Sequence, residues 1–383
     1  MRLSRRAEQI TKSEIRTMSV ECERAGGINL SQGVCDMEVP LRVRRGAQWA
    51  IDEGINSYTR HDGLAELRTA IARKLESYNG IRVDPETEIV ASGGSTGAFY
   101  CACLALLDPG DEVIVFEPYY GYHVNTLMAV EVKPAFVRLS APTWAFSIQD
   151  VRNAINPRTR GILVNTPANP TGKVFSRAEL DAIAEVARAN DLIVFTDEIY
   201  EYILYDDRKH LSPGAIDAIR DRTVTISGHS KTFSITGWRI GYSACRADWA
   251  QVIGYMNDLV YVCAPAPLQI GVAHGIDELG PDYYDKLRIE FAAKREQLCT
   301  ALDKARLTPC RPEGAYYVLF DATRLRGETS KERAMYLLEQ TGVATVPGSA
   351  FFSGDGGEGL LRACFAKSDQ ELEDACRRLE RLR

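Results

Sequence analysis

The sequence predicts an α/β protein, in which a largely parallel sheet is covered by helices on both faces and is followed by a smaller α+β domain. In the middle of the chain, strands that are apolar throughout alternate with helical segments, which is typical of parallel strands buried on both faces. After about Pro281 the pattern changes, and a long charged helix begins. The length of 383 residues also suits two or three domains.

The chain is expected to begin with an arm. Residues 1–45 are polar at first and then rich in glycine, which favours an extended segment, joined to part of the smaller domain, over a packed element. Apolar residues at helical spacing predict helices over 43–51 and 64–78. We place the large domain at residues 46–280 and the C-terminal small domain at residues 281–383.

The remaining elements follow in chain order. Strands are predicted at 89–91, 112–116, 160–164, 192–196 and 223–226. Helices are predicted at 98–107 and 176–189, the second from a capping box formed by Ser176 and Glu179. Beyond residue 281 we expect a helix at 283–304, a strand at 315–320, a helix at 331–340, a strand at 360–365 and a final helix from Ser368.

Composition excludes several classes of function. The formal net charge of -6 argues against a nucleic-acid or anionic-membrane surface. No apolar stretch reaches the length of a membrane span, and the basic, polar N-terminus lacks a signal-peptide core, so a cytosolic location is expected. The ten cysteines and five histidines show no metal-ligand spacing. We therefore expect reduced cysteines and no metal.

The chemistry-bearing residues gather where strands end, which is where α/β proteins bind ligands. The turn Gly93-Gly94-Ser95-Thr96-Gly97 leads into a helix and could hold a phosphate at the helix N-terminus. It matches neither the dinucleotide nor the nucleoside-triphosphate glycine motif. A turn required only for close packing would explain this stretch equally well.

Asp197 directly follows a buried strand and needs a positive or N–H partner at that depth. One interpretation is a cap for the next helix. The other is a partner for a protonated heterocycle nitrogen, which would make the ring a better electron sink, with Tyr200 near the same ligand.

The stretch Ser227–Gly241 carries Lys231 and, eight residues later, Arg239. An apolar site would lower the pKa of such a lysine and prepare its amine for a Schiff base. An arginine held by a turn could bind a phosphate. By itself, the stretch could equally contain a surface lysine and an ion-paired arginine.

Together these stretches resemble the class I/II, fold-type I aminotransferases that use pyridoxal 5'-phosphate (PLP), of the aspartate/aromatic aminotransferase kind. The matching features run from about residue 30 to 365 and are Tyr58-Thr59 with Gly63, Gly94-Ser95-Thr96, Pro118-Tyr119-Tyr120, Asn165–Gly172, Asp197-Glu198-Ile199-Tyr200, Ser230-Lys231 with Arg239, and Leu361-Arg362. The resemblance implies a large, mostly parallel seven-stranded sheet domain with a smaller α+β domain.

The resemblance also implies roles around the cofactor ring. Lys231 would form the internal aldimine and move the proton between the substrate Cα and the cofactor C4'. Asp197 would pair with the pyridinium nitrogen. Asn169 and Tyr200 would hydrogen-bond the ring oxygen, and Tyr120 would stack on the ring.

The phosphate and the substrate have their own implied partners. Ser95, Thr96 and Arg239 would hold the phosphate, and Tyr58 would reach it from the partner subunit of an obligate homodimer. Arg362 would grip the substrate α-carboxylate, with the Gly33 backbone and Asn169 nearby.

This chain departs from the family pattern before the lysine. Gly228 stands where many relatives place a phosphate-binding hydroxyl, so Ser230 or Ser227 would take that part, and His229 fills a slot that is usually apolar or aromatic. His123 has the spacing from Tyr120 of a histidine that orients the pyridinium-binding aspartate. We therefore predict a hydrogen bond between His123 and Asp197.

The expected activity is transfer of an amino group between an L-amino acid, with aspartate or an aromatic one favoured, and a 2-oxo acid such as 2-oxoglutarate. The alternative is a carbon–sulfur β-lyase or a related synthase on the same fold. The aminotransferase-like domain of a transcription regulator is disfavoured, because only about thirty residues precede Gly33 and the chain is acidic. Arg60 and His61 could supply a second cation for a dicarboxylate, or form a solvated turn.

Overall fold

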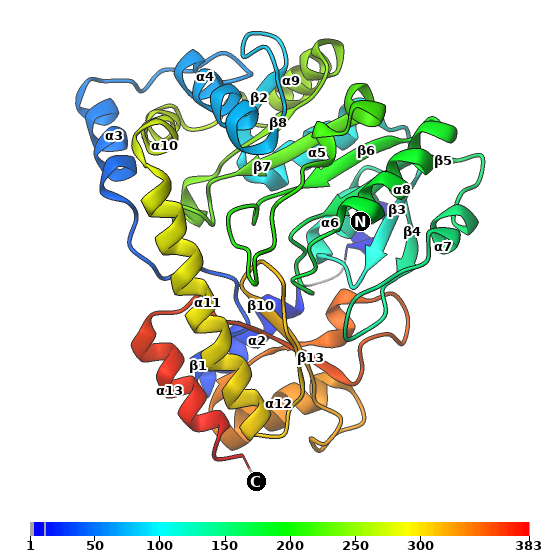
Figure 1. Ribbon diagram of the computed structural model, residues 1–383, viewed down its shortest axis with the longest axis vertical. Coiled ribbons are helices and arrows are strands. Elements are labelled where there is room, and N and C mark those ends of the chain that lie inside the picture. Colours follow the sequence, from blue (N-terminus) through cyan, green and yellow to red (C-terminus); the bar gives the residue numbers. More distant parts are fainter. Residues whose placement is uncertain (1–3, 11–12, 383) are drawn as a thin grey trace.

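The computed structural model describes residues 4–10 and 13–382 (Figure 1). Its largest sheet has seven strands in the order β2-β8-β7-β6-β5-β3-β4, and β8 alone runs antiparallel to its neighbours. The strands are β2 Ile89–Gly93, β3 Glu112–Glu117, β4 Lys133–Arg138, β5 Thr159–Asn165, β6 Ile193–Asp197, β7 Thr223–Gly228 and β8 Ile240–Ala244. The predicted α/β class with a mostly parallel sheet is confirmed.

Helices cover both faces of this sheet because its strands are apolar on both sides. Ile162 and Val164 of β5 pack in the cluster that contains α8, whereas Leu163 packs in the cluster that contains α5. The helices of this part are α3 Leu41–Asp52, α4 Ala65–Lys74 continued by a π-helix Leu75–Asn79, α5 Gly94–Leu106, α6 Gly121–Ala129, α7 Ile148–Asn153, α8 Arg177–Ala189, α9 Ala247–Tyr261 and α10 Ala266–Glu278. The capping box predicted for Ser176 and Glu179 is present at α8.

A second body lies below the large sheet in Figure 1 and is joined to it by α11 Pro281–Lys304. It contains a four-stranded sheet of order β12-β13-β10-β9 and a two-stranded sheet of β1 and β11. Its strands are β1 Ile28–Asn29, β9 Pro309–Cys310, β10 Tyr317–Asp321, β11 Val343–Ala344, β12 Val346–Pro347 and β13 Leu360–Cys364, and its later helices are α12 Ser330–Thr341 and α13 Asp369–Leu379. The domain boundaries drawn from the sequence stay a prediction.

The expectation of an extended arm over residues 1–45 is wrong for its first half. Residues Arg5–Gln9 form α1 and residues Glu14–Arg24 form α2. Met18 and Cys22 of α2 are buried in the core that also contains α11, α12 and α13. Two apolar residues one helical turn apart make a narrow stripe in a polar segment, and packing against the second body stabilises the helix.

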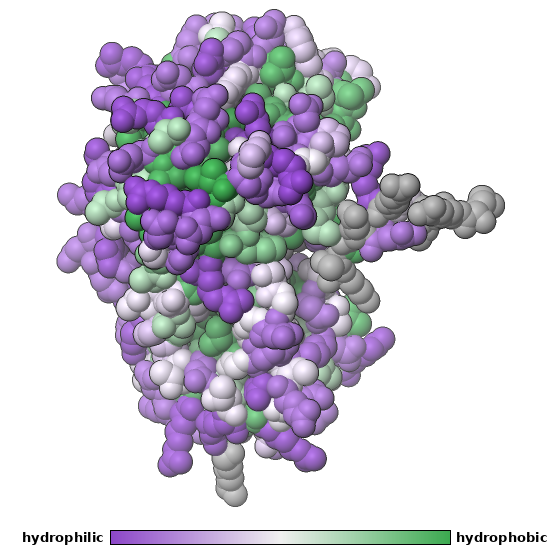
Figure 2. Space-filling model, turned by 90° about the vertical axis from the view of Figure 1, so that its right-hand side faces the viewer, coloured by the Kyte–Doolittle hydropathy of each residue, from purple (hydrophilic) through white to green (hydrophobic). Residues whose placement is uncertain are grey.

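In the described part of the chain, no helix has the length and apolar character required to cross a membrane. Hydrophilic side chains predominate on the face of the molecule drawn in Figure 2.

Candidate active site

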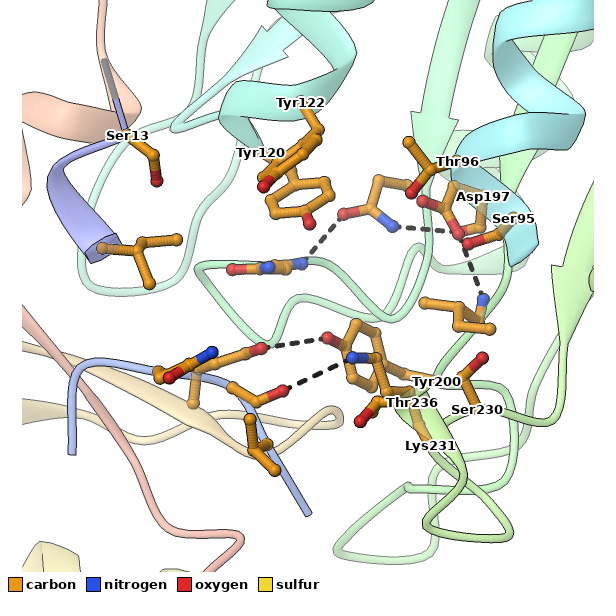
Figure 3. Close-up of a pocket in the computed structure, with 18 of the residues that line it drawn as sticks. Ser13, Ser95, Thr96, Tyr120, Tyr122, Asp197, Tyr200, Ser230, Lys231 and Thr236 are labelled. Atoms are coloured by element: carbon orange, nitrogen blue, oxygen red, sulfur yellow. Dashed lines mark hydrogen bonds between the residues drawn. The ribbon is translucent and has the colours of Figure 1, made fainter. Parts of the chain in front are cut away.

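A cavity of about 410 Å³ lies at the carboxyl ends of the central strands, where the chain leaves β3, β5, β6 and β7 (Figure 3). Its lining includes ten of the residues singled out in the sequence: Gly33, Ser95, Thr96, Tyr120, Asn169, Asp197, Tyr200, Ser230, Lys231 and Arg239. These residues come from segments up to about two hundred positions apart, and the parallel sheet brings them to one edge.

Lys231 follows β7 and directs its amine into the cavity (Figure 3). Its Nζ lies 3.4 Å from the carbonyl oxygen of Gly33 and 6.0 Å from the ring centre of Tyr316. Removal of water by the surrounding side chains lowers the pKa of the Lys231 ammonium to about 8. About a tenth of this amine is therefore neutral at pH 7, far more than for an ordinary lysine, and the neutral form is able to act as a nucleophile.

Asp197 ends β6 and is buried together with His123 of α6. The His123 Nε2 atom lies 2.8 Å from Asp197 Oδ2, which confirms the predicted hydrogen bond. The other carboxylate oxygen accepts from the backbone N–H of Ile199 at 3.2 Å. These contacts fix the orientation of the carboxylate at the cavity wall.

Ser95 and Thr96 line the cavity at the N-terminus of α5, where backbone N–H groups and the helix dipole favour an anion. Arg239 lies beside them and donates hydrogen bonds to the carbonyl oxygens of Gly93 at 3.1 Å and Thr236 at 3.0 Å. The Arg239 backbone is left-handed, with φ of 59°, a conformation that costs an arginine about 1 kcal/mol. Its guanidinium forms no ion pair with any described residue.

The segment before Lys231 shows why Gly228 stands where relatives have a hydroxyl. A Cβ there would lie 2.9 Å from the carbonyl oxygen of Ile240 on the neighbouring strand. Ser227, one of the two candidates to replace that hydroxyl, is excluded. It is buried behind the sheet edge, and its Oγ donates to Glu201 Oε1 at 2.7 Å. Ser230 lines the cavity and remains the candidate (Figure 3).

His229 also lies outside the lining of the cavity. Its ring is buried and stacks on Phe233 with centroids 4.8 Å apart. Burial, followed by the positive charge of Lys74, lowers the pKa of His229 to about 3. The histidine is therefore a neutral packing residue in a position where relatives place an apolar side chain.

Arg362 of β13 lies behind the cavity wall and is fully buried. Its two terminal nitrogens donate to Asn169 Oδ1 at 2.8 Å and to the Ser31 carbonyl oxygen at 2.6 Å. The guanidinium lies between the rings of Tyr317 and Phe351, at 4.2 and 4.8 Å from their centres. A buried cation with no ion pair to a described residue is a strong site for a carboxylate.

Tyr317 is a cavity residue that the sequence analysis missed. Its hydroxyl lies 3.1 Å from that of Tyr200, and burial raises the pKa of Tyr200 well above its usual range. Other lining residues that were missed as functional candidates are Ser13, Ile15, Arg16, Gln32, Val34, Ile199 and Thr236, whereas Tyr122, considered from the sequence as a surface for an aromatic or apolar substrate side chain, does line the cavity. For Tyr317, its position on a predicted strand was the one feature of the sequence that could have suggested a place at the cavity. For the others the sequence held no such feature, because packing between distant segments decides which side chains reach the cavity.

Three further candidates lie outside this cavity. Tyr58 has 84% of its surface exposed, so its predicted reach into a partner's site stays a prediction. Arg60 forms ion pairs with Asp62 and Glu86, and His61 packs near Tyr255 with ring centres 5.7 Å apart. In the isolated chain, neither Arg60 nor His61 supplies the second cation.

One buried group of described residues has the composition of a metal site. Ligand atoms of Glu198, Glu201 and His210 lie within 4.8 Å of one another. However, Lys74 Nζ lies 2.5 Å from Glu201 Oε1, and His210 Nε2 lies 2.6 Å from Glu198 Oε2. We interpret the group as an ion-pair network, because its carboxylates already have positive or N–H partners.

The cavity fits PLP in its distribution of charge. Two cations have no acidic partner among the described residues: Arg239 lines the cavity together with the Lys231 amine, and Arg362 hydrogen-bonds the lining residue Asn169. A hydrogen-bonded carboxylate, Asp197, lines the same cavity. The helix N-terminus with Ser95 and Thr96 suits a phosphate group, and the aromatic ring of Tyr120 also lines the wall. The donor set therefore matches a phosphate, a ring nitrogen and a carboxylate.

Comparison with known proteins agrees with this geometry. Residues 25–379 match the sequence profile of the family aminotransferase class I and II. The aspartate aminotransferase of Pyrococcus abyssi is 33% identical over 389 residues, covering 100% of this chain and 98% of that protein. The structure of N-succinyldiaminopimelate aminotransferase from Mycobacterium tuberculosis has a TM-score of 0.96 at 34% identity, with 100% of both chains covered. Aspartate aminotransferase from Thermus thermophilus with maleate has a TM-score of 0.93 at 31% identity, again with 100% of both chains covered.

Proposed function

Because the chain belongs to the aminotransferase class I and II family, we propose that it transfers an amino group between an L-amino acid and a 2-oxo acid such as 2-oxoglutarate, with PLP bound to Lys231. One observation carries this proposal. The Lys231 amine, with a pKa lowered to about 8, shares a cavity with Asp197, the partner of His123, and with Arg239, and Arg362 hydrogen-bonds the lining residue Asn169; neither guanidinium has an acidic partner among the described residues.

Each part of the cavity has a task in such a reaction. Bound PLP supplies an electron sink for the negative charge that develops at the substrate Cα. Asp197, oriented by His123, holds a proton on the ring nitrogen. Arg362 and Asn169 orient the substrate through its α-carboxylate, and the Lys231 amine takes the proton from Cα.

We further propose that the enzyme prefers aspartate or an aromatic amino acid as its amino donor. This proposal is supported by the names of similar proteins, which include aspartate, aromatic-amino-acid and methionine aminotransferases. Tyr120 and Tyr122 stack on each other at the cavity with ring centres 5.3 Å apart, and they offer an apolar surface to a side chain.

We also propose that the enzyme is a homodimer with shared active sites. Apart from Tyr78 and Tyr122, the large apolar side chains that are exposed in the described large-sheet part belong to residues 41–58 and 255–262, and they are Leu41, Trp49, Ile51, Tyr58, Tyr255, Leu259, Val260 and Val262. Leu259 is 80% exposed, which is unusual for a large aliphatic side chain unless a partner covers it. Sedimentation should show a dimer, and Leu259→Arg should shift it toward monomer.

The decisive experiment is half-transamination. The purified enzyme is loaded with PLP and mixed with single amino acids, and loss of the visible absorbance band is followed together with release of the 2-oxo acid. Stoichiometric 2-oxo acid, with recovery of the band on adding 2-oxoglutarate, is expected for a transaminase. Pyruvate and ammonia released continuously from one substrate would contradict the proposal and indicate the β-lyase alternative.

A further inference from the structure

The first turn of α2 reaches the active-site cavity through Ser13, Ile15 and Arg16. Ser13 lies at the opposite end of the cavity from Ser95 and Ser230, the side chains assigned to the phosphate (Figure 3). Arg16 also lines the cavity, is exposed to solvent, and donates its backbone N–H to the Ser13 carbonyl oxygen at 3.1 Å, so its backbone lies at this end, where the far end of a substrate would lie.

Arg16 has no ion pair or side-chain hydrogen bond with any residue that the structure describes. The acidic neighbour on the same turn, Glu14, is bound to Lys331, with Glu14 Oε2 2.6 Å from Lys331 Nζ. Among the described residues that line the cavity, Asp197 is the only acidic one, and it is held by His123 at 2.8 Å. The Arg16 guanidinium therefore has no acidic partner, either on its own helical turn or among the described residues that line the cavity.

The positive groups of the cavity can be matched with the negative groups of the ligands. Arg239 and the α5 N-terminus serve the phosphate, Arg362 serves the α-carboxylate, and Lys231 serves the reacting carbon in the proposed reaction. Arg16 is then the cation that remains. The adjacent helix N-terminus and the lining residue Gln32 add further hydrogen-bonding capacity at this end.

We propose that Arg16 is a specificity-determining residue, which binds a carboxylate at the end of the substrate side chain. The preferred amino donors are then amino acids with a second, distal carboxylate, in preference to aromatic or aliphatic ones. This inference rests on the proposed transaminase function and narrows its substrate class. A guanidinium is suited to this task because it can form two parallel hydrogen bonds to one carboxylate.

The test compares Arg16→Met with the wild-type holoenzyme by half-transamination. The panel contains aspartate, glutamate and 2-aminoadipate on one side, and alanine, methionine and phenylalanine on the other. We expect the apparent second-order rate constant for the best carboxylate-bearing donor to fall about 10- to 100-fold, the range for loss of one charge-assisted hydrogen-bonded contact. Rate constants for the uncharged donors should change less than about threefold, because uncharged side chains make no such contact.

Controls separate this contact from a change in the helix. Arg24→Met removes an exposed arginine from the last turn of the same helix and should leave the whole panel unchanged. Arg16→Lys keeps the charge and should retain part of the preference for carboxylates. Inhibition by the inert diacids succinate and glutarate, measured against propionate, should weaken selectively in Arg16→Met.

Two results would overturn the inference and leave the transaminase function standing. One is a wild-type enzyme that prefers uncharged donors over every carboxylate-bearing donor in the panel. The other is an Arg16→Met variant that loses activity equally with both groups of donors or with neither. Failure of the proposed function itself has a different signature, since the wild-type enzyme would then release no 2-oxo acid from any donor.

Discussion

The segment from Asp197 to Glu201 separates two polar regions of opposite character. Asp197 and Tyr200 line the active-site cavity, whereas Glu198 and Glu201 face the buried side toward α4. On the buried side, Glu201 accepts hydrogen bonds from Ser227 at 2.7 Å and Asn79 at 2.8 Å, in addition to its ion pair with Lys74. Burial opposes ionisation of Glu201, but Lys74 and His210 outweigh it and lower the pKa of that carboxyl.

Glu198 is satisfied in the same way, by Thr196 at 2.7 Å, Ser212 at 2.8 Å and His210 at 2.6 Å. The cavity side differs, because its cations Arg16, Arg239 and Arg362 have no acidic partner among the described residues. Buried charges that the protein neutralises itself are costly to the fold once one partner is removed. Cations without an acidic partner mark the place where negatively charged groups of a ligand would bind. Four predictions test this difference between the buried charges and the cavity cations.

The largest effect is expected on the cavity side, from Lys231→Ala. This variant loses both the attachment point of the cofactor and the group that moves the proton, so the half-transamination rate should fall by about 10⁴-fold or more. Thermal unfolding should stay close to wild type, since the Lys231 amine forms no ion pair with a described residue. Near wild-type turnover by this variant would remove the basis of the proposed function.

On the buried side, Lys74→Met should affect stability instead. It leaves the carboxylate of Glu201 buried without its cation, which costs about 3–5 kcal/mol in the free energy of unfolding. Denaturant unfolding measures this loss, and the activity of the remaining folded enzyme should change only a few-fold.

The double variant Lys74→Met with Glu201→Gln is the matched control. Removing the unpaired charge should recover most of the lost stability. A double variant that is no more stable than Lys74→Met would show that the network contributes through packing and that its charges are not the cause.

His123 shares features of both regions. It is buried, and its hydrogen-bond partner Asp197 lines the cavity. His123→Phe removes the hydrogen bond to Asp197 and should lower the half-transamination rate about 10- to 100-fold, with a change in the visible spectrum of the bound cofactor. His123→Asn keeps a donor and should recover part of both properties. An unchanged spectrum in His123→Phe would show that this histidine only packs.

The smallest effect concerns pH. Since the pKa of Lys231 is lowered to about 8, the neutral amine increases as pH rises through that value, and attachment of PLP to the cofactor-free enzyme should be about tenfold faster at pH 9 than at pH 7. Stopped-flow absorbance gives this rate. A midpoint near the usual lysine value, above pH 10, would show that the cavity does not shift the pKa of this lysine.

Much of the site could be predicted because its residues follow strands directly. Asp197 and Lys231 each follow an apolar run, and parallel strands deliver the residues after them to one edge. The hydrogen bond between His123 and Asp197 could also be predicted, from a spacing within a recognised motif. Strand β8 was missed, because Ile240–Ala244 is short and contains a glycine and a serine, which weaken the strand pattern.

By itself, then, the sequence determined the α/β class, the ends of the central strands and the groups that surround Lys231, because these depend on local apolar runs and on motifs of a few residues. Tertiary structure alone decided three other features. It turned Ser227 toward Glu201, placed Tyr317 beside Tyr200, and brought Arg16 of α2 to the cavity. Each depends on contacts between segments that are distant in the chain, and no local pattern records which face of such a segment will meet the other.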